Sequence, residues 1–284
     1  MSEVSLSRRR FLASGAAAAG YALAAKPLLA AAIQTPDAGL QTGAVSIPVA
    51  GGEMSAYFAA PEGTSRAPLA LVVHEIFGVH EYIRDVCRRH AKAGYFAIAP
   101  DLYQRHGDVS KIDDVQKIIQ EVVMAIPDAE VMADLDATVA WVKQQGKADV
   151  DRTVITGFCW GGRIVWLYGA HAPAIRAGVA WYGRLEGADR PQTPTHPIDV
   201  ASGDLPPILG LYGTEDSGIP LASIEEMKRR LADTGQDSEI VLFPGAPHGF
   251  HADYRASYRA LAASEGWRRM LAWFEKHAGG PGEG

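Results

Sequence analysis

The chain has 284 residues, 48% of them hydrophobic, which is enough for one large domain with a single core, although the length would also allow two small domains. The formal net charge is −6, and no basic cluster occurs outside the first ten residues. The sequence therefore lacks the positive patch that binding to a phosphate backbone requires, which argues against a nucleic-acid partner.

The first 32 residues are typical of a twin-arginine export signal. Three consecutive arginines at positions 8–10 precede Phe11 and Leu12, and a weakly apolar, Ala-rich run follows over residues 13–25. This run is too short for a stable membrane span, and the small residues after it predict cleavage behind Ala32. An ordinary basic N-terminal helix is the alternative. We expect an exported, periplasmic protein with no stable membrane span once the signal is removed.

Strand and helix patterns alternate through the rest of the chain. A linker over residues 33–43 leads into a predicted β-hairpin around Gly51 and Gly52. Beyond it, apolar runs of strand length alternate with segments of helical periodicity. The predicted strands are residues 44–49, 53–59, 69–74, 95–100, 153–156, 177–181, 207–212 and 239–243, and the predicted helices are residues 80–93, 129–145, 161–170, 221–233 and about 254–277.

This order predicts an α/β fold with a mostly parallel central sheet and helices on both faces. A single domain is expected over residues 44–277. Residues 183–205, rich in Pro, Thr and Asp, are predicted to be a loop long enough to need a functional or lid-type explanation. Residues 278–284 are predicted to be a disordered tail.

The two cysteines occur in different settings. Cys87 has helical spacing from Ile83, which favours a buried structural thiol. Cys159 lies in Gly-Phe-Cys-Trp-Gly, between a predicted strand and a predicted helix, as in a nucleophile elbow with sulfur in place of oxygen. The flanking glycines relieve the crowding of so sharp a turn. A cysteine at a helix N-terminus is a candidate nucleophile, and the backbone N–H of Trp160 would face a developing oxyanion.

Two further residues complete a candidate triad. Asp216 follows the strand predicted over residues 207–212, and His248 follows the strand over residues 239–243. The order nucleophile, acid, histidine, each behind a strand, is the order of an α/β hydrolase. Glu215 is the competing acid and His251 the competing base, and we rank both lower.

Four segments carry a resemblance that covers nearly the whole chain behind the signal. They are His74-Glu75-Ile76-Phe77-Gly78, Pro100-Asp101-Leu102-Tyr103-Gln104-Arg105, Gly157-Phe158-Cys159-Trp160-Gly161-Gly162 and His248-Gly249-Phe250. In this order they resemble the dienelactone hydrolase (carboxymethylenebutenolidase) family of the α/β-hydrolase superfamily. The resemblance implies the α/β-hydrolase fold and cleavage of a small ester or lactone.

The resemblance also implies roles for residues that periodicity would not single out. It assigns Glu75 to the resting thiol, whose proton this glutamate would accept when substrate arrives. A carboxylate in a closed apolar cleft is expected to have a raised pKa that suits this task. The backbone N–H of Ile76 would complete the oxyanion hole, and Arg105 would hold a substrate carboxylate. From the residues alone, Glu75 and Arg105 would be interpreted as exposed loop charges.

One position departs from the family pattern. Dienelactone-cleaving members carry a second arginine four residues after the catalytic histidine, where this chain has Ala252. Arg255, placed at the start of the predicted last helix, is the candidate substitute. The departure bears on whether a dienelactone is the substrate, and on which group holds Glu75 electrostatically in the resting state.

We therefore expect a hydrolase that uses Cys159, His248 and Asp216 through a thioester intermediate. Its pocket would include Tyr103, Tyr182 and Arg255, with Trp160 and Trp181 as further aromatic walls. No metal-ligand spacing or dinucleotide fingerprint is present, so neither a metal nor a cofactor is expected. The alternatives are a carboxylesterase or thioesterase for another small periplasmic substrate, or a non-catalytic binding protein on the same fold.

Overall fold

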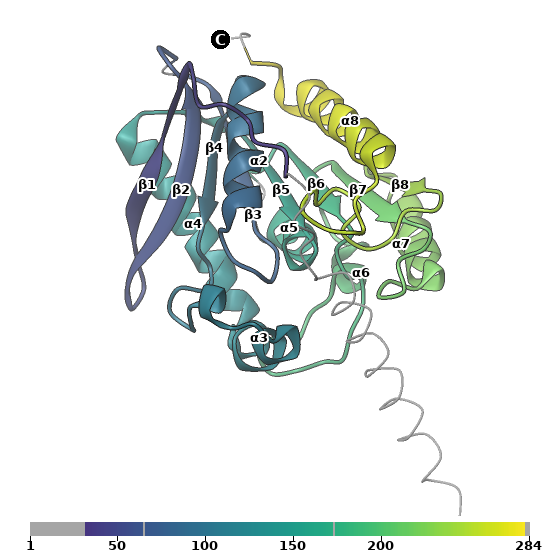
Figure 1. Cartoon of the computed structure of the whole chain (residues 1–284). Helices are drawn as coiled ribbons and strands as arrows, with labels where there is room; N and C mark the ends of the chain where they lie inside the picture. The colour runs from purple at the N-terminus through teal and green to yellow at the C-terminus, as the bar shows by residue number, and fades with distance from the viewer. Residues whose placement is uncertain (1–31, 65, 173, 282–284) are drawn as a thin grey trace, which may run out of the picture.

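The computed structural model describes residues 32–64, 66–172 and 174–281, which form one eight-stranded sheet with helices on both sides (Figure 1). The strand order is β1-β2-β4-β3-β5-β6-β7-β8. The first three strands in this order pair antiparallel, and the remaining pairs are parallel. The predicted α/β-hydrolase architecture is confirmed. The predicted signal over residues 1–32 lies almost wholly outside the described residues.

The central strands are continuous apolar runs because both of their faces are covered. Every residue of β3, β4, β6 and β7 is buried, whereas β1 at the edge alternates between buried and exposed positions. The strands are β1 (Leu40–Val49), β2 (Gly52–Pro61), β3 (Pro68–Val73), β4 (Phe96–Pro100), β5 (Asp149–Phe158), β6 (Ala177–Trp181), β7 (Ile208–Gly213) and β8 (Glu239–Phe243).

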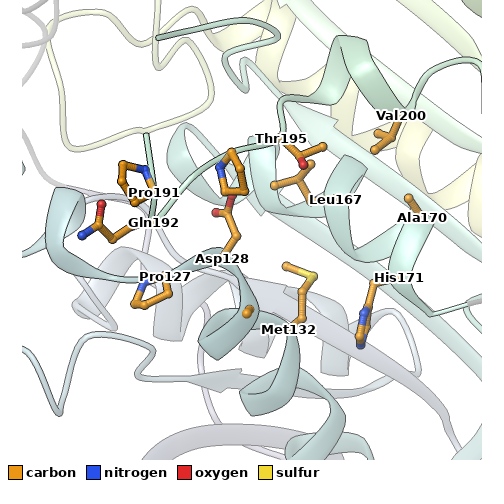
Figure 2. A pocket seen from close by; sticks show the side chains of 12 residues that line it. Pro127, Asp128, Met132, Leu167, Ala170, His171, Pro191, Gln192, Thr195 and Val200 are labelled. Atoms are coloured by element: carbon orange, nitrogen blue, oxygen red, sulfur yellow. The ribbon is translucent and has the colours of Figure 1, made fainter. Parts of the chain in front are cut away.

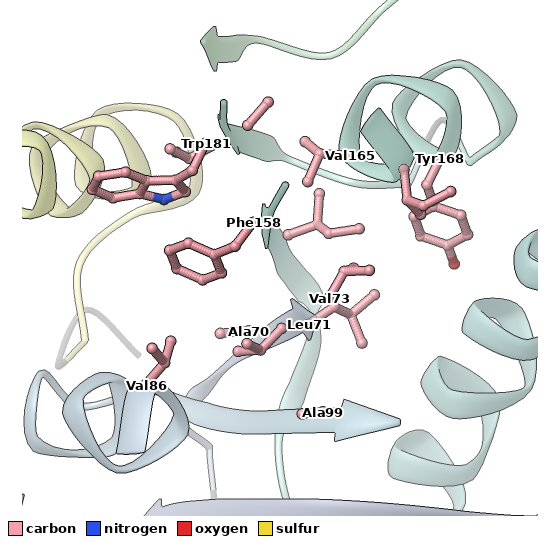
Figure 3. Close-up of a cluster of buried hydrophobic side chains, with 14 of the residues drawn as sticks. Ala70, Leu71, Val73, Val86, Ala99, Phe158, Val165, Tyr168 and Trp181 are labelled. Atoms are coloured by element: carbon pink, nitrogen blue, oxygen red, sulfur yellow. The ribbon is translucent and has the colours of Figure 1, made fainter. Parts of the chain in front are cut away.

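The helices enclose two layers of core. Figure 3 shows Val86 of one helix and Trp181 on one side of the strands, with Val165 and Tyr168 of another helix on the other side. The α-helices are α2 (Glu81–Lys92), α3 (Val115–Glu121), α4 (Asp128–Gln145), α5 (Trp160–His171), α6 (Pro197–Val200), α7 (Leu221–Thr234) and α8 (Ala260–Ala278). In Figure 3, α2 and α8 lie on the side of Trp181, and α4 and α5 lie opposite.

Several predicted boundaries are wrong. Strand β5 begins at Asp149, four residues early, because it continues to pair with β3 beyond the apolar run. Helix α8 begins at Ala260, and a series of turns occupies the six preceding residues. Helix α3 and two short 3-10 helices (Val109–Lys111 and Val123–Ala125) occupy a region where no element is predicted.

The predicted linker and the predicted disordered tail both make contacts with the domain. In the linker, the backbone N–H of Thr35 donates to Asp85 Oδ1 at 2.5 Å, and Arg88 Nε donates to the Thr35 carbonyl at 3.0 Å. In the predicted tail, Ala278 completes α8, and the Gly280 carbonyl accepts a hydrogen bond from Arg152 at 3.1 Å. The folded unit therefore extends beyond residues 44–277 at both ends.

Candidate active site

Cys159 stands on a strained turn between β5 and α5. Its backbone has φ 57° and ψ −114°, a region that residues with a side chain rarely occupy. A Cβ on Gly157 would lie 2.3 Å from the carbonyl oxygen of Gly161, and one on Gly161 would lie 2.4 Å from that of Val73. Only glycine fits at these two positions, so the predicted elbow geometry is present. Cys159 is buried at the carboxyl edge of the sheet.

His248 and Asp216 meet beside this turn. His248 Nδ1 and Asp216 Oδ2 are 2.7 Å apart, and Asp216 Oδ1 accepts the backbone N–H of Gly218 at 2.8 Å. The loops behind β7 and β8 touch, since a Cβ on Gly213 would lie 2.0 Å from the Ala246 carbonyl oxygen. This contact brings the acid and the base together.

The two competing residues lie elsewhere. Glu215 is exposed, and its backbone N–H donates to Ala246. His251 is buried with its Nδ1 2.7 Å from the Tyr82 hydroxyl, and its ring packs against Trp181 with the centroids 4.5 Å apart. Burial holds the pKa of His251 well below its usual range, so this ring is a neutral core residue.

The pKa of His248 depends on both Asp216 and Cys159. Burial alone would lower its pKa, but the Asp216 carboxylate and the charge and hydrogen bonding of Cys159 outweigh burial and raise the pKa to about 10. Its Nδ1–H faces Asp216, so the proton that completes the imidazolium belongs on Nε2, on the side of Cys159. Asp216 and Cys159 therefore both favour the protonated form of this imidazole.

Glu75 follows β3 and is fully buried, yet it is not paired as expected. Its Oε2 accepts the Tyr254 hydroxyl at 2.7 Å and lies 3.4 Å from His80 Nε2, while Oε1 lies 3.1 Å from Arg255 Nη2. Burial alone would raise the pKa of Glu75, but Arg255, His80 and Tyr254 outweigh it and lower the pKa to about 2. The expectation of a raised pKa is wrong, because Arg255, the candidate substitute for the second family arginine, pairs with Glu75.

Arg255 supplies this cation, and it lies outside the helix in which the sequence predicted it. It lies in the turns before α8 rather than in the helix, with its guanidinium 4.9 Å from the Phe77 ring centroid. Although the ion pair with Glu75 is short, Glu75 Oε1 and Arg255 Nη2 have no well-aligned hydrogen bond within the described part of the chain. Glu75 Oε1 and Arg255 Nη2 are therefore close in space, and each could accept or donate a further hydrogen bond.

Arg105 does not lie free in the site. Its Nη2 is 2.6 Å from Glu130 Oε1 and 2.6 Å from Asp134 Oδ2, both on α4. Two carboxylates therefore already occupy the guanidinium, and a substrate carboxylate would have to compete with them. The predicted role of Arg105 in binding substrate is not supported by this position.

The two candidate oxyanion-hole groups come from adjacent segments. Trp160 is the first residue of α5, where backbone N–H groups have no partner within the helix. Ile76 follows β3, and a Cβ on Gly161 would touch the carbonyl oxygens of Val73 and His74 at 2.4 and 2.6 Å. The start of α5 is thus pressed against the segment that carries Ile76.

The predicted aromatic walls fall into two groups. Tyr103 and Tyr182 lie at the site: the charge of Cys159 adds to burial in raising the pKa of each phenol, and the Tyr182 ring lies 5.1 Å from that of His248. Trp181 instead belongs to the core, since its indole packs against Gly266 of α8 and donates to Thr156. Cys87 is also core, and burial raises the pKa of its thiol.

A separate groove lies between α4, α5 and the loop before α6. It has a volume of about 340 Å³ and a mainly apolar lining that includes Met132, Leu167 and Pro191 (Figure 2). None of its lining residues belongs to the triad candidates. The groove is therefore distinct from the site around Cys159.

Sequence reasoning missed three polar residues of the site. Tyr254 and His80 hold Glu75, and His74 contacts the Glu75 carbonyl. No pattern in the sequence marks Tyr254 or His80, and the resemblance includes His74 in a segment without giving it a role. Across the described ranges, no group of three His, Cys, Asp or Glu side chains is arranged to hold a metal ion. No helix in those ranges is long and apolar enough to cross a membrane.

Known proteins resemble this chain over most of its length. The model of the "Dienelactone hydrolase family" matches residues 54–278. A "Putative carboxymethylenebutenolidase" of Methylorubrum extorquens is 53% identical over 97% of this chain and 94% of its own length. One of Escherichia coli K12 is 48% identical over 92% of this chain and 96% of its own length. A solved "Putative Dienelactone Hydrolase" from Klebsiella pneumoniae is 49% identical, with a TM-score of 0.81 over 84% of this chain and 99% of that one.

Fold, site and relatives define a carboxylic-ester hydrolase of the α/β-hydrolase class. The family match covers far more than half of the chain. The chain belongs to the dienelactone hydrolase family.

Proposed function

We propose that this protein hydrolyses a small ester or lactone through Cys159, His248 and Asp216, with a thioester intermediate. The observation that carries the proposal is the placement of His248 between the Asp216 carboxylate and Cys159 on its strained elbow, where both neighbours raise the pKa of the imidazole. A cysteine next to an imidazolium is the arrangement of a nucleophilic thiolate.

Acylation begins at Cys159. The Cys159 thiolate attacks the carbonyl carbon, and the electron pair of the C=O bond moves to oxygen. The N–H groups of Trp160 and Ile76 stabilise the oxyanion. When the intermediate collapses, the C–O bond to the leaving alkoxide breaks and His248 Nε2 gives the alkoxide its proton. In a lactone the alcohol remains attached to the acyl group.

Deacylation reverses these roles. Neutral His248, oriented by Asp216, removes a proton from water, and the hydroxide attacks the thioester carbonyl. Collapse of the second tetrahedral intermediate releases the carboxylic acid and the Cys159 thiolate. His248 is then cationic again and the resting charges are restored.

Arg255, rather than Arg105, is the candidate partner for a substrate carboxylate. The relatives' name, carboxymethylenebutenolidase, indicates a lactone that carries a carboxylate. Arg105 is neutralised by Glu130 and Asp134, whereas Arg255 has a guanidinium nitrogen with no aligned hydrogen bond in the described chain. A substrate carboxylate that draws Arg255 away would also raise the pKa of Glu75, because the largest influence lowering it would weaken.

Trapping the acyl-enzyme tests the proposed intermediate. We expect a p-nitrophenyl ester, quenched in acid during turnover, to leave one acyl group on the peptide that contains Cys159, removable by hydroxylamine. The peptide with Cys87 serves as the internal control because its thiol is buried in the core. An acyl group on another residue, or turnover with no acyl group at all, contradicts the mechanism.

We also propose that the protein is exported by the twin-arginine route, on the sequence of residues 1–32. Replacing Arg8, Arg9 and Arg10 together by Lys is expected to retain the precursor in the cytoplasm, since Lys keeps the charge but not the motif. Fractionation of cells that express either form provides the measurement. Undiminished periplasmic accumulation of the triple variant excludes this route.

A further inference from the structure

His74, the residue after β3, makes a hydrogen bond with each ring nitrogen. Its Nε2 accepts the backbone N–H of Leu102 at 3.1 Å, so its proton is on Nδ1. Nδ1–H then donates to the Glu75 carbonyl oxygen at 2.7 Å. The ring is completely buried, and burial lowers its pKa, so this neutral tautomer persists at physiological pH.

The bond to Glu75 acts on the group next to it. The Glu75 carbonyl and the Ile76 N–H belong to one planar trans peptide, in which C=O and N–H point in opposite directions. A hydrogen bond that fixes the carbonyl therefore fixes the direction of the Ile76 N–H. The N–H of Gly78 donates to the same carbonyl at 3.2 Å and closes the turn.

The same ring also contacts the other candidate donor residue. The His74 and Trp160 rings are stacked, with centroids 5.5 Å apart and planes 19° apart. Tyr103 packs edge-on against His74, with centroids 4.5 Å apart. His74 thus touches the Ile76 peptide through a hydrogen bond and the Trp160 residue through its ring.

We propose that His74 is a positioning residue that sets the oxyanion hole by holding the Glu75–Ile76 peptide and supporting Trp160. The inference rests on the proposed function, in which these two N–H groups receive the oxyanion. His74 is not a proton donor in the reaction, because both of its nitrogens are already engaged with backbone groups.

Two substitutions separate the two hydrogen bonds of His74. In Asn, the amide nitrogen is as many bonds from Cα as Nδ1, so His74→Asn keeps a donor for Glu75 and loses the acceptor for Leu102. In Gln, the amide oxygen is as many bonds from Cα as Nε2, so His74→Gln keeps the acceptor for Leu102 and loses the donor for Glu75. Each variant is the matched control of the other.

Comparing acylation with alkylation distinguishes positioning from a structural role. Acylation of Cys159 by a p-nitrophenyl ester, followed as the burst of p-nitrophenol, passes through an oxyanion. Alkylation by iodoacetamide, in which the thiolate displaces iodide from a saturated carbon, does not. We expect His74→Gln to slow acylation about 10-fold to 100-fold while alkylation stays within about twofold of the wild type. His74→Asn is expected to retain most of the acylation rate.

Each other outcome overturns the inference. Equal losses in both reactions of His74→Gln would show that the whole site has collapsed, and full acylation would show that the bond is dispensable. A His74→Asn variant as slow as His74→Gln would mean that the donor to Glu75 is not the cause. The wild type distinguishes the proposed role of Cys159 from the proposed role of His74. If complete alkylation by iodoacetamide leaves ester turnover intact, Cys159 is not the nucleophile, whatever the His74 variants show.

Discussion

Replacing Cys159 by Ala is expected to lower ester turnover by about 10⁴-fold or more, since the variant loses the nucleophile and the thioester route with it. Ala has a Cβ like Cys, so the strained φ of 57° and the close approaches of Gly157 and Gly161 are unchanged. The rate of p-nitrophenyl ester hydrolysis, with a denaturation curve for each protein, measures the effect. The fold should persist while the activity disappears.

Cys87→Ala is the matched control for the loss of a thiol. Cys87 is fully buried in α2 and burial raises its pKa, so it contributes packing and no nucleophile. We expect near wild-type kcat/KM and a loss of stability of about 1 kcal/mol from the smaller side chain. If Cys159→Ala kept more than a small fraction of the wild-type rate of ester hydrolysis, or if Cys87→Ala lost that activity, Cys159 would not be the nucleophile.

The sequence predicted best the short apolar strands that lie between turn-forming residues. Strands β6 and β8 have the predicted bounds because they are short apolar runs between turns. The elbow around Cys159 was predictable because only glycine tolerates the close contacts at positions 157 and 161. Local sterics and hydrophobicity are properties of the sequence itself.

What local sequence could not indicate depends on partners far along the chain. Arg105 could equally hold a substrate or a salt bridge, and the outcome was set by Glu130 and Asp134, 25 and 29 residues away. The segment before α8 has a helical pattern, but Arg255 is drawn inward to Glu75, and turns replace the helix. The same pair sets the low pKa of Glu75, which no local feature could indicate.

Arg255→Met is expected to destabilise the folded protein by about 3–5 kcal/mol at pH 7, because it leaves the carboxylate of Glu75 buried without its main cation. Adding Glu75→Gln should restore most of this loss, since no uncompensated charge then remains. Urea unfolding of the two single variants and the double variant measures the coupling. Additive losses would show that the two side chains do not depend on each other.

The pH dependence of that loss has a definite sign. In the wild type the folded pKa of Glu75, about 2, lies below its unfolded value of 4.5, so the pair stabilises the fold above pH 4.5 and the contribution is lost as pH falls towards 2. Without Arg255 the folded pKa rises, since burial opposes the charge. The difference in unfolding free energy between the wild type and Arg255→Met should therefore be largest near pH 7 and shrink towards pH 4.

The Glu75→Gln background also tests substrate charge, because neither protein in the comparison then carries the Glu75 carboxylate that competes for Arg255. Comparing Glu75→Gln/Arg255→Met with Glu75→Gln, we expect kcat/KM for a carboxylated lactone to fall about tenfold to a hundredfold, with little change for a neutral ester of similar size. Arg105→Met is the control, and it should alter both substrates equally because its charge is already neutralised by Glu130 and Asp134. Suppose instead that Arg105→Met lowers kcat/KM for the carboxylated lactone alone, and that removing Arg255 does not. Arg105 would then bind the substrate carboxylate, and it would have to leave its ion pairs with Glu130 and Asp134 on α4 to do so.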